Sequence, residues 1–146
     1  MTVNAPSDPP AALVPPPLPS PDFDSEGFWA AAAERRLTVC RCQACGEWLQ
    51  PPLERCRRCA GPTAFEDVAG TGEIYSFIVV RHPSVPAFVS RLPYAIAVVA
   101  LDEGVRMPGM VVGVDTADVA IGQRVNADWE SLPGSDDPAL VWRVAG

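Results

Sequence analysis

The sequence predicts a mainly β protein, in which an N-terminal helix and a small cysteine-bearing ribbon precede a five-stranded barrel of the OB type. Three observations support this fold class. Four cysteines form two Cys-x2-Cys pairs, five later segments have the composition of strands, and one stretch before the cysteines has apolar residues at helical spacing. A chain of 146 residues is long enough for one compact domain and an appendage, but not for two large domains.

The first 37 residues predict a tail followed by a helix. Residues 1–20 contain seven of the 17 prolines and predict a disordered, partly extended tail. Residues 21–37 predict a helix that Asp24 or Ser25 caps and that runs to about Arg36. Phe28 and Trp29 belong to its apolar stripe, which covers either the protein's own core or a docked partner.

Residues 38–62 hold all five cysteines and predict a ribbon around a metal ion. Cys42 and Cys45 form one pair, Cys56 and Cys59 form the other, and ten residues separate the pairs. Two such pairs can surround one tetrahedral zinc ion, and four thiolates leave no open position for water or substrate. We therefore expect one structural zinc ion. Cys40 is either a replacement ligand or, as we favour, a small buried apolar residue.

Basic residues surround the cysteines and suggest a second role for the ribbon. Arg55, Arg57 and Arg58 are close in sequence to the second cysteine pair. Their charge can compensate the thiolates, which is the simpler interpretation, or it can bind an anion such as the phosphates of coenzyme A. We retain these arginines as candidate partner or CoA contacts, together with Phe28 and Trp29.

Residues 63–146 predict the barrel. Its strands are expected at residues 74–80, 94–101, 107–114, 123–130 and 140–144, where β-branched, aromatic or alternating residues are bounded by turn formers. A Greek-key barrel of the OB type suits five short strands, and a five-stranded sandwich is the alternative. Tyr75 and Phe77 would share one strand face, as base-stacking aromatics do, but without a basic groove we interpret them as core.

Charge and composition exclude several function classes. The net charge is −7, which disfavours binding to nucleic acid. No apolar run approaches the roughly 20 residues that a membrane span needs, and residues 1–20 do not resemble a secretory signal, so we expect a cytoplasmic protein. His82 is the single histidine and has no nucleophile at a suggestive spacing, so no catalytic residue is predicted.

The motifs taken together resemble a family of small proteins with an N-terminal helix, a rubredoxin-like zinc ribbon and an OB-fold, which was long labelled a domain of unknown function. The resemblance covers roughly residues 22–144. It rests on these segments: Gly27-Phe28-Trp29, Cys42-Gln43-Ala44-Cys45-Gly46, Gln50-Pro51-Pro52, Cys56-Arg57-Arg58-Cys59, Gly70-Thr71-Gly72-Glu73-Ile74-Tyr75-Ser76-Phe77 and Leu92-Pro93-Tyr94. One departure is Ala60, because glycine usually follows the last cysteine of the family's second pair.

The resemblance implies a non-catalytic accessory or scaffold subunit. Members of this family look like partners of acyl-CoA enzymes: thiolase-like and lipid-transfer-type proteins, hydroxymethylglutaryl-CoA synthases, and the aldolases or hydratases that shorten steroid side chains. We therefore expect a thiolase-like, aldolase or hydratase partner subunit, and a contribution to its acyl-CoA site. The alternative is a single-stranded nucleic-acid-binding module, because ribbons and OB-folds also serve that role.

Overall fold

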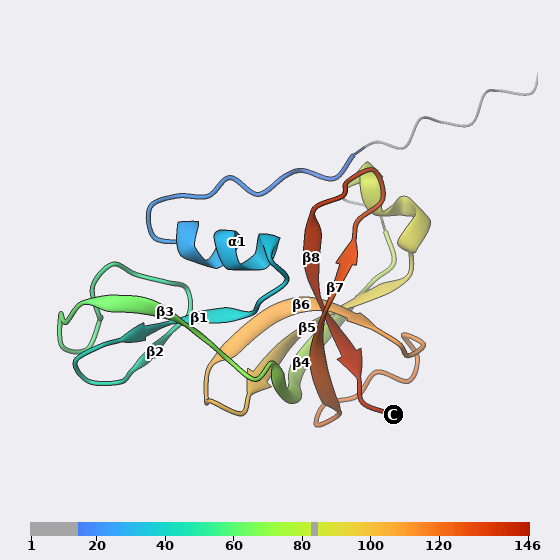
Figure 1. Ribbon diagram of the computed structural model, residues 1–146. Coiled ribbons are helices and arrows are strands. Elements are labelled where there is room, and N and C mark those ends of the chain that lie inside the picture. The colour runs from blue at the N-terminus through green and yellow to red at the C-terminus, as the bar shows by residue number, and fades with distance from the viewer. Residues whose placement is uncertain (1–14, 83–84) are drawn as a thin grey trace, which may run out of the picture.

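A three-stranded ribbon sheet and a closed five-stranded barrel form the body of the protein in the computed structural model, which describes residues 15–82 and 85–146 (Figure 1). The elements in chain order are α1 (Glu26–Ala33), β1 (Thr38–Cys42), β2 (Trp48–Leu49), β3 (Thr63–Asp67), β4 (Thr71–Val80), the 3-10 helix η1 (Pro86–Arg91), β5 (Tyr94–Leu101), β6 (Arg106–Val112), β7 (Arg124–Ser131) and β8 (Pro138–Val144). The expected mainly β architecture with one N-terminal α-helix is confirmed.

Helix α1 begins where the sequence predicts and ends earlier. Its N-cap is Ser25, whose backbone N–H and hydroxyl both donate to Asp22 Oδ1, at 2.9 and 2.7 Å. The prediction that it reaches Arg36 is wrong, because Arg35 has a φ of 59° and turns the chain out of the helix. The N–H groups of Glu34 and Arg36 then close the end by donating to the carbonyl of Ala31.

The ribbon sheet has the strand order β2-β1-β3, with both pairings antiparallel. Residues 63–67 were expected with the barrel, but they form β3 and pair along the whole of β1, with Cys40 opposite Phe65. Phe65 packs on the small apolar cluster of the ribbon, which explains the pairing. The chain enters the barrel only after β3.

The barrel has the strand order β4-β5-β6-β8-β7 and closes where β7 pairs with β4. The parallel pairing of β6 with β8 is the Greek-key crossover expected of an OB-fold, so the sandwich alternative is wrong. Strand β5 has the predicted bounds, whereas β4 begins three residues before the predicted Ile74.

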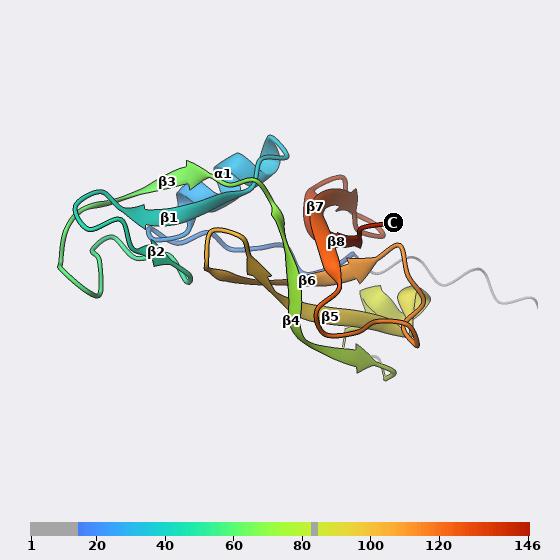
Figure 2. The ribbon, with the colours of Figure 1, turned by 90° about the horizontal axis from the view of Figure 1, so that it is seen from below.

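One apolar core joins the barrel to the segment that precedes it. Trp142 on β8 is fully buried, and a Cβ atom on Gly109 of β6 would lie 2.7 Å from its Nε1 atom. Gly109 is therefore needed for the tryptophan to fit inside the barrel. Leu37 and Val39, at the entry to β1 and within it, belong to the same core. The ribbon sheet is thus anchored on the barrel (Figure 2).

A β-bulge at Tyr75 changes which residues of β4 face the core. Ile74 is opposite Val99 and Ser76 is opposite Val98, so Tyr75 is the extra residue. Tyr75 is 49% exposed, with the guanidinium of Arg106 3.6 Å from its ring centre. Phe77 is half-buried and packs on the barrel core. The prediction that Tyr75 and Phe77 are both core residues is therefore wrong for Tyr75, because the bulge turns its side chain outward.

The described part of the predicted tail lies against the barrel. Residues 1–14 are outside the described residues, so the expectation of disorder there is not addressed. Residues 15–20 have no helix or strand, yet Pro16 is buried. Pro15 also lies close to the loop between β7 and β8, since a Cβ atom on Gly134 would be 3.3 Å from its Cα atom. Among the described helices, none has the length and apolar character that crossing a bilayer requires.

Candidate metal centre

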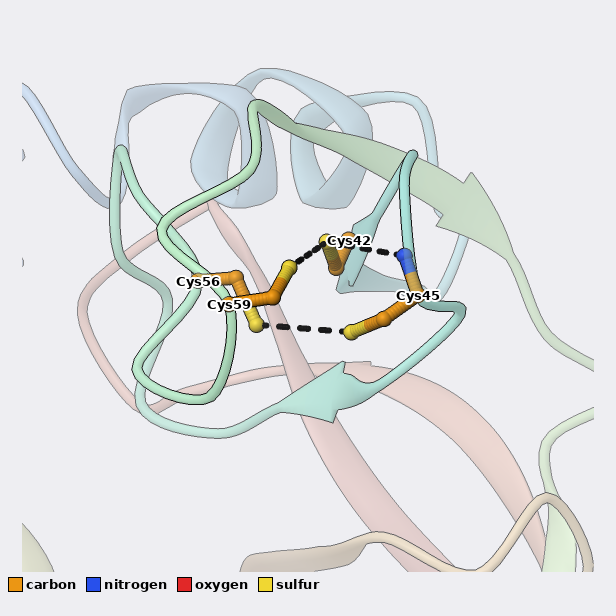
Figure 3. Close-up of side chains that lie close together, drawn as sticks. All are labelled: Cys42, Cys45, Cys56 and Cys59. Carbon is orange, nitrogen blue, oxygen red and sulfur yellow. Dashed lines mark hydrogen bonds between the residues drawn. The ribbon is translucent and has the colours of Figure 1, made fainter.

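Two similar turns bring the four paired cysteines together. The first follows β1, where the N–H of Gly46 donates to the carbonyl of Cys42 at 3.1 Å. The second lies between β2 and β3, where the N–H of Ala60 donates to the carbonyl of Cys56 at 2.8 Å. Gly46 and Ala60 both have a positive φ, 76° and 61°. The two turns face each other and present their thiols to a common point (Figure 3).

The distances between the thiols fit one tetrahedral metal ion. Cys42 Sγ and Cys59 Sγ are 3.5 Å apart, and Cys45 Sγ and Cys56 Sγ are 3.7 Å apart. All four sulfur atoms lie within 4.8 Å of one another. A tetrahedral zinc ion with bonds of about 2.3 Å separates its ligands by about 3.8 Å. These four thiols could therefore hold one zinc ion, and its four-coordinate sphere would then be complete.

Backbone N–H groups around the sulfur atoms favour the thiolate form that a metal requires. Cys42 Sγ accepts from the N–H groups of Cys45 and Ala44, both at 3.4 Å. The hydrogen bond from Cys45 contributes most, and the pKa of Cys42 falls to about 6, whereas burial and the neighbouring thiols raise the pKa of Cys45 in the absence of a metal ion. In the second turn, Cys56 Sγ accepts from the N–H of Arg58 at 3.3 Å. The turns thus supply hydrogen bonds to the sulfur atoms as well as the correct spacing.

Cys40 lies outside this group of four. Its side chain is 2% exposed, and its Sγ donates to the carbonyl of Leu53 at 3.5 Å. It belongs to the apolar cluster beneath the ribbon, with Leu49 and Phe65. Of the two interpretations of Cys40, the structure favours the small buried residue.

Two of the three candidate arginines of the ribbon already have an acidic neighbour. Arg57 and Arg58 both reach Glu47, at 3.7 and 3.5 Å. Arg55 is exposed and forms an isolated backbone bridge with Pro62. The surface beside the second cysteine pair is therefore less positive than the run of arginines suggests.

The two candidate aromatics of α1 contact each other, and both line one groove beside the helix. The rings of Phe28 and Trp29 meet edge to face, with centres 5.0 Å apart. Phe28 packs on the barrel core, which is the first of the two roles expected for this stripe. Phe28 and Trp29 both line a groove of about 810 Å³ between α1 and the barrel, and its lining also includes Trp129 and Leu140.

Sequence reasoning missed this groove. Its walls come from the segment Pro16–Pro19, from α1, from β6, and from β7, β8 and the loop between them. Most of these residues are separated by long stretches of chain, so no local pattern indicates that they meet. His82 is exposed, and nothing in the described residues places a nucleophile beside it.

Comparison with protein families matches two parts of the chain. Residues 29–66 match the rubredoxin-like zinc ribbon domain of ChsH2, and residues 65–130 match the C-terminal OB-fold domain of ChsH2. The boundary between the two matches falls in β3, so the zinc ribbon includes most of the strand that the sequence analysis assigned to the barrel. The expected zinc cofactor is confirmed by this match together with the group of four cysteines.

Curated relatives carry names from scaffolds and enzyme subunits. The chain is 42% identical over 130 residues to the probable enoyl-CoA hydratase alpha subunit of Thermomonospora curvata, covering 88% of this chain but only 39% of that protein. It is 33% identical over 116 residues to a DUF35 domain-containing scaffold protein of Methanocaldococcus jannaschii, covering 77% of this chain and 82% of the relative.

A solved structure gives the same result for the fold. The chain superposes on the Ltp2-ChsH2(DUF35) aldolase with a TM-score of 0.81 and 35% identity, covering 88% of this chain and 100% of the other. Proteins similar to this one are therefore scaffold proteins and subunits of hydratase and aldolase complexes, which is consistent with an accessory subunit. The chain belongs to the DUF35 family, with the rubredoxin-like zinc ribbon and OB-fold of ChsH2.

Proposed function

We propose that this protein is a non-catalytic scaffold subunit of an enzyme that acts on acyl-CoA thioesters. The partner we propose is a thiolase-fold subunit, either a lipid-transfer-type thiolase or an aldolase, that shortens steroid or lipid side chains. One observation carries the proposal: the chain matches the whole of the ChsH2(DUF35) chain of a solved aldolase, at 35% identity. The resemblance of its motifs to partners of steroid side-chain enzymes supports the choice of substrate.

The metal centre fits a scaffold better than an enzyme. In this proposal Cys42, Cys45, Cys56 and Cys59 bind one zinc ion as thiolates. A zinc ion with four thiolate ligands has no open position at which to activate water or polarise a substrate. When bound, the ion cross-links the two turns of the ribbon, and the chain's own residues form the docking surface around it.

Co-purification is the test of this function. The full-length chain carries a cleavable tag in its source cells, bound proteins are identified by mass spectrometry, and zinc is quantified in the same eluate. We expect one zinc ion per chain and a stoichiometric acyl-CoA enzyme subunit. We also expect that subunit to turn over its thioester more slowly, or to precipitate, without this chain. Zinc-loaded protein that elutes alone, or that cleaves or hydrates acyl-CoA thioesters by itself, would contradict the proposal.

The contribution to acyl-CoA binding has a separate test. Arg55, Arg57 and Arg58 are replaced together by alanine, and CoA affinity of the purified complex is measured by isothermal titration calorimetry. We expect roughly tenfold weaker binding, because guanidinium groups form strong charge-assisted bonds with phosphates. Arg35→Ala, in the turn after α1, is the matched control. Unchanged CoA affinity of the triple variant would remove these arginines from the site and leave the scaffold role intact.

A further inference from the structure

Half of β4 has one edge that no described strand covers. Strand β4 spans ten residues, and β5 pairs with it along most of its length. Strand β7 covers the other edge only at Thr71–Glu73. The segment Ser76–Val80 therefore has β5 on one side and, within residues 15–82 and 85–146, no strand on the other. In Figure 2, the far end of β4 extends below the rest of the barrel.

The ladder identifies the backbone groups on this open edge. Ile74 faces β7, since its N–H donates to Gln123 and its carbonyl accepts from Gly122, whereas the carbonyl of Thr71 accepts from Asp102 on the β5 side. In an antiparallel pair, the backbone N–H and C=O groups of successive residues point alternately to the two sides of the strand. After the bulge at Tyr75, the backbone groups of Ser76, Ile78 and Val80 point toward β5. The N–H and C=O groups of Phe77 and Val79 consequently point away from β5, to the open edge.

This edge lacks the features that usually protect a sheet edge. Strand β2 has only two residues, and β3 carries Glu66 and Asp67. Short length and charged residues both discourage the addition of another strand. Ser76–Val80 contains no charge and no proline, and Ile78 is 62% exposed. Compared with the outer edges of β2 and β3, this edge is better suited to accept an extended segment.

Two arginines lie at the ends of the edge. Arg81 directly follows β4, and Arg106 lies over the ring of Tyr75 at the other end. Both are exposed, and no ion pair involving either is found in the described part of the chain. The other exposed basic groups of the barrel, Arg124 and Arg143, are held by acidic residues. The open edge is thus bounded by two available positive charges on a protein with a net charge of −7.

A second copy of the chain is disfavoured as the occupant in the two registers that place Phe77 opposite Val79 or opposite Phe77. Suppose that the β4 edges of two copies pair with Phe77 of one copy opposite Val79 of the other. Arg81 of one copy would then lie opposite Tyr75 of the other, beside the Arg106 that stacks on that tyrosine. Like charges would then meet. If Phe77 lay opposite Phe77, Arg81 would be directed to Glu73, where β7 already occupies the edge.

We propose that the open edge of β4 docks an extended strand of the acyl-CoA enzyme subunit, with acidic residues of that subunit against Arg81 and Arg106. The inference rests on the proposed function, and it adds the surface and the chemistry of the contact. Backbone hydrogen bonds to Phe77 and Val79 supply the pairing, and the two arginines fix its register.

The first test removes a backbone donor from the edge. Val79→Pro eliminates the outward N–H without breaking a bond to β5, and Val79→Ala is the matched control, because it shortens the side chain but keeps the N–H. We expect the enzyme subunit that co-purifies with the wild-type chain to bind Val79→Pro at least about tenfold more weakly, in view of the lost hydrogen bond and altered edge. Val79→Ala should retain most of the affinity.

A charge-reversed variant and a hydrogen-exchange measurement test the same edge without relying on the folding of Val79→Pro. Arg81→Glu with Arg106→Glu should weaken the complex about tenfold or more, whereas Arg35→Glu should not. Hydrogen exchange of the wild-type chain should slow at the amides of Phe77 and Val79 when the enzyme subunit binds, while those of Ser76 and Ile78 are already protected by β5.

The outcomes separate this inference from the proposed function. If the wild-type chain binds the enzyme subunit but exchange at Phe77 and Val79 is unchanged, or if the charge-reversed variant binds with wild-type affinity, the edge is not the docking surface and the scaffold function stands. If the wild-type chain binds no acyl-CoA enzyme subunit at all, the proposed function fails and the inference fails with it.

Discussion

At the scale of the residue, each of the two cysteine turns contains one residue with a positive φ, Gly46 in the first turn and Ala60 in the second. Glycine adopts this conformation without strain, whereas alanine does not. The second turn therefore carries a backbone cost that the first does not.

Ala60 provides a direct test of the second turn. Its φ of 61° is a left-handed conformation that costs an L-residue about 1–2 kcal/mol, and the equivalent position in the first turn is Gly46. We expect Ala60→Gly to raise the free energy of unfolding of the zinc-bound protein by about 0.5–1 kcal/mol, because glycine's greater unfolded-state entropy offsets part of the relief. Urea denaturation in the presence of zinc measures the change.

Substitution of Gly61, the next residue, is the matched control for Ala60→Gly, because there it is the glycine that the turn requires. A Cβ atom there would lie 2.8 Å from the Cβ of Ala44 and 3.1 Å from the sulfur atoms of Cys42 and Cys59. Gly61→Ala should therefore weaken zinc binding, as a competition assay with a chromogenic chelator would show. A destabilised Ala60→Gly variant would mean that the turn does not have this conformation.

Asp102 gives a prediction about pH. Its carboxylate accepts from Arg124 twice at 2.8 Å and from the hydroxyl of Thr71 at 2.6 Å. Arg124 contributes most, and the pKa of Asp102 lies well below its usual range. Because the folded state has the lower pKa, the ion pair stabilises the protein above the unfolded pKa of about 3.9, and this contribution is lost as the pH falls through the folded pKa.

Nuclear magnetic resonance can follow that carboxylate directly. The carbon-13 shift of Asp102 should remain that of a carboxylate at pH 4, and Arg124→Gln should raise its pKa toward the usual value. Asp118, for which no ion pair is described, serves as a reference in the same spectrum. A wild-type Asp102 that titrates near 4 would contradict the contact.

The metal centre itself could be predicted from the sequence. The spacing of Cys42, Cys45, Cys56 and Cys59 was sufficient, because ligand geometry restricts these motifs strongly. The partners of Arg57 and Arg58 could not be predicted, since Glu47 meets them only after the ribbon has folded.

At the scale of the element, predictions succeeded where the local pattern is strong. The apolar run that forms β5 is delimited by turns and was predicted with its correct bounds. The assignment of β3 failed because Thr63–Asp67 is a short strand whose partner, β1, comes before both cysteine turns. The bulge at Tyr75 depends on pairing with β5 and has no signal of its own in the sequence.

Removal of the metal tests the independence of the two sheets. The ribbon's own apolar cluster consists of little more than Leu49, Phe65 and cysteine side chains, whereas the barrel has a large core. Structural zinc ions contribute on the order of 10 kcal/mol in small ribbons. We expect a strong chelator to abolish hydrogen-exchange protection in β1–β3 first, while β5 and β8 remain protected. Loss of protection throughout the molecule in one step would show that ribbon and barrel unfold together.

At the scale of the whole molecule, the distribution of charge separates the two functions that this fold suggests. The sequence has 18 acidic residues against 11 basic ones. Most of the arginines are already paired with acids, among them Arg36, Arg41, Arg91, Arg124 and Arg143. The basic groove that single-stranded nucleic acid requires is therefore not formed by the described residues, although the barrel has the OB topology.

We accordingly expect no binding to single-stranded DNA or RNA, even where electrostatic attraction is strongest. Fluorescence anisotropy with labelled 20-nucleotide probes of mixed sequence, at about 20 mM salt, measures this, because the screening length there is more than twice that at physiological salt. The zinc-loaded full-length chain should leave the anisotropy unchanged at micromolar concentrations. Binding whose affinity falls steeply with added salt would indicate phosphate contacts. In that case the barrel would be a nucleic-acid module and the scaffold function would have to be abandoned.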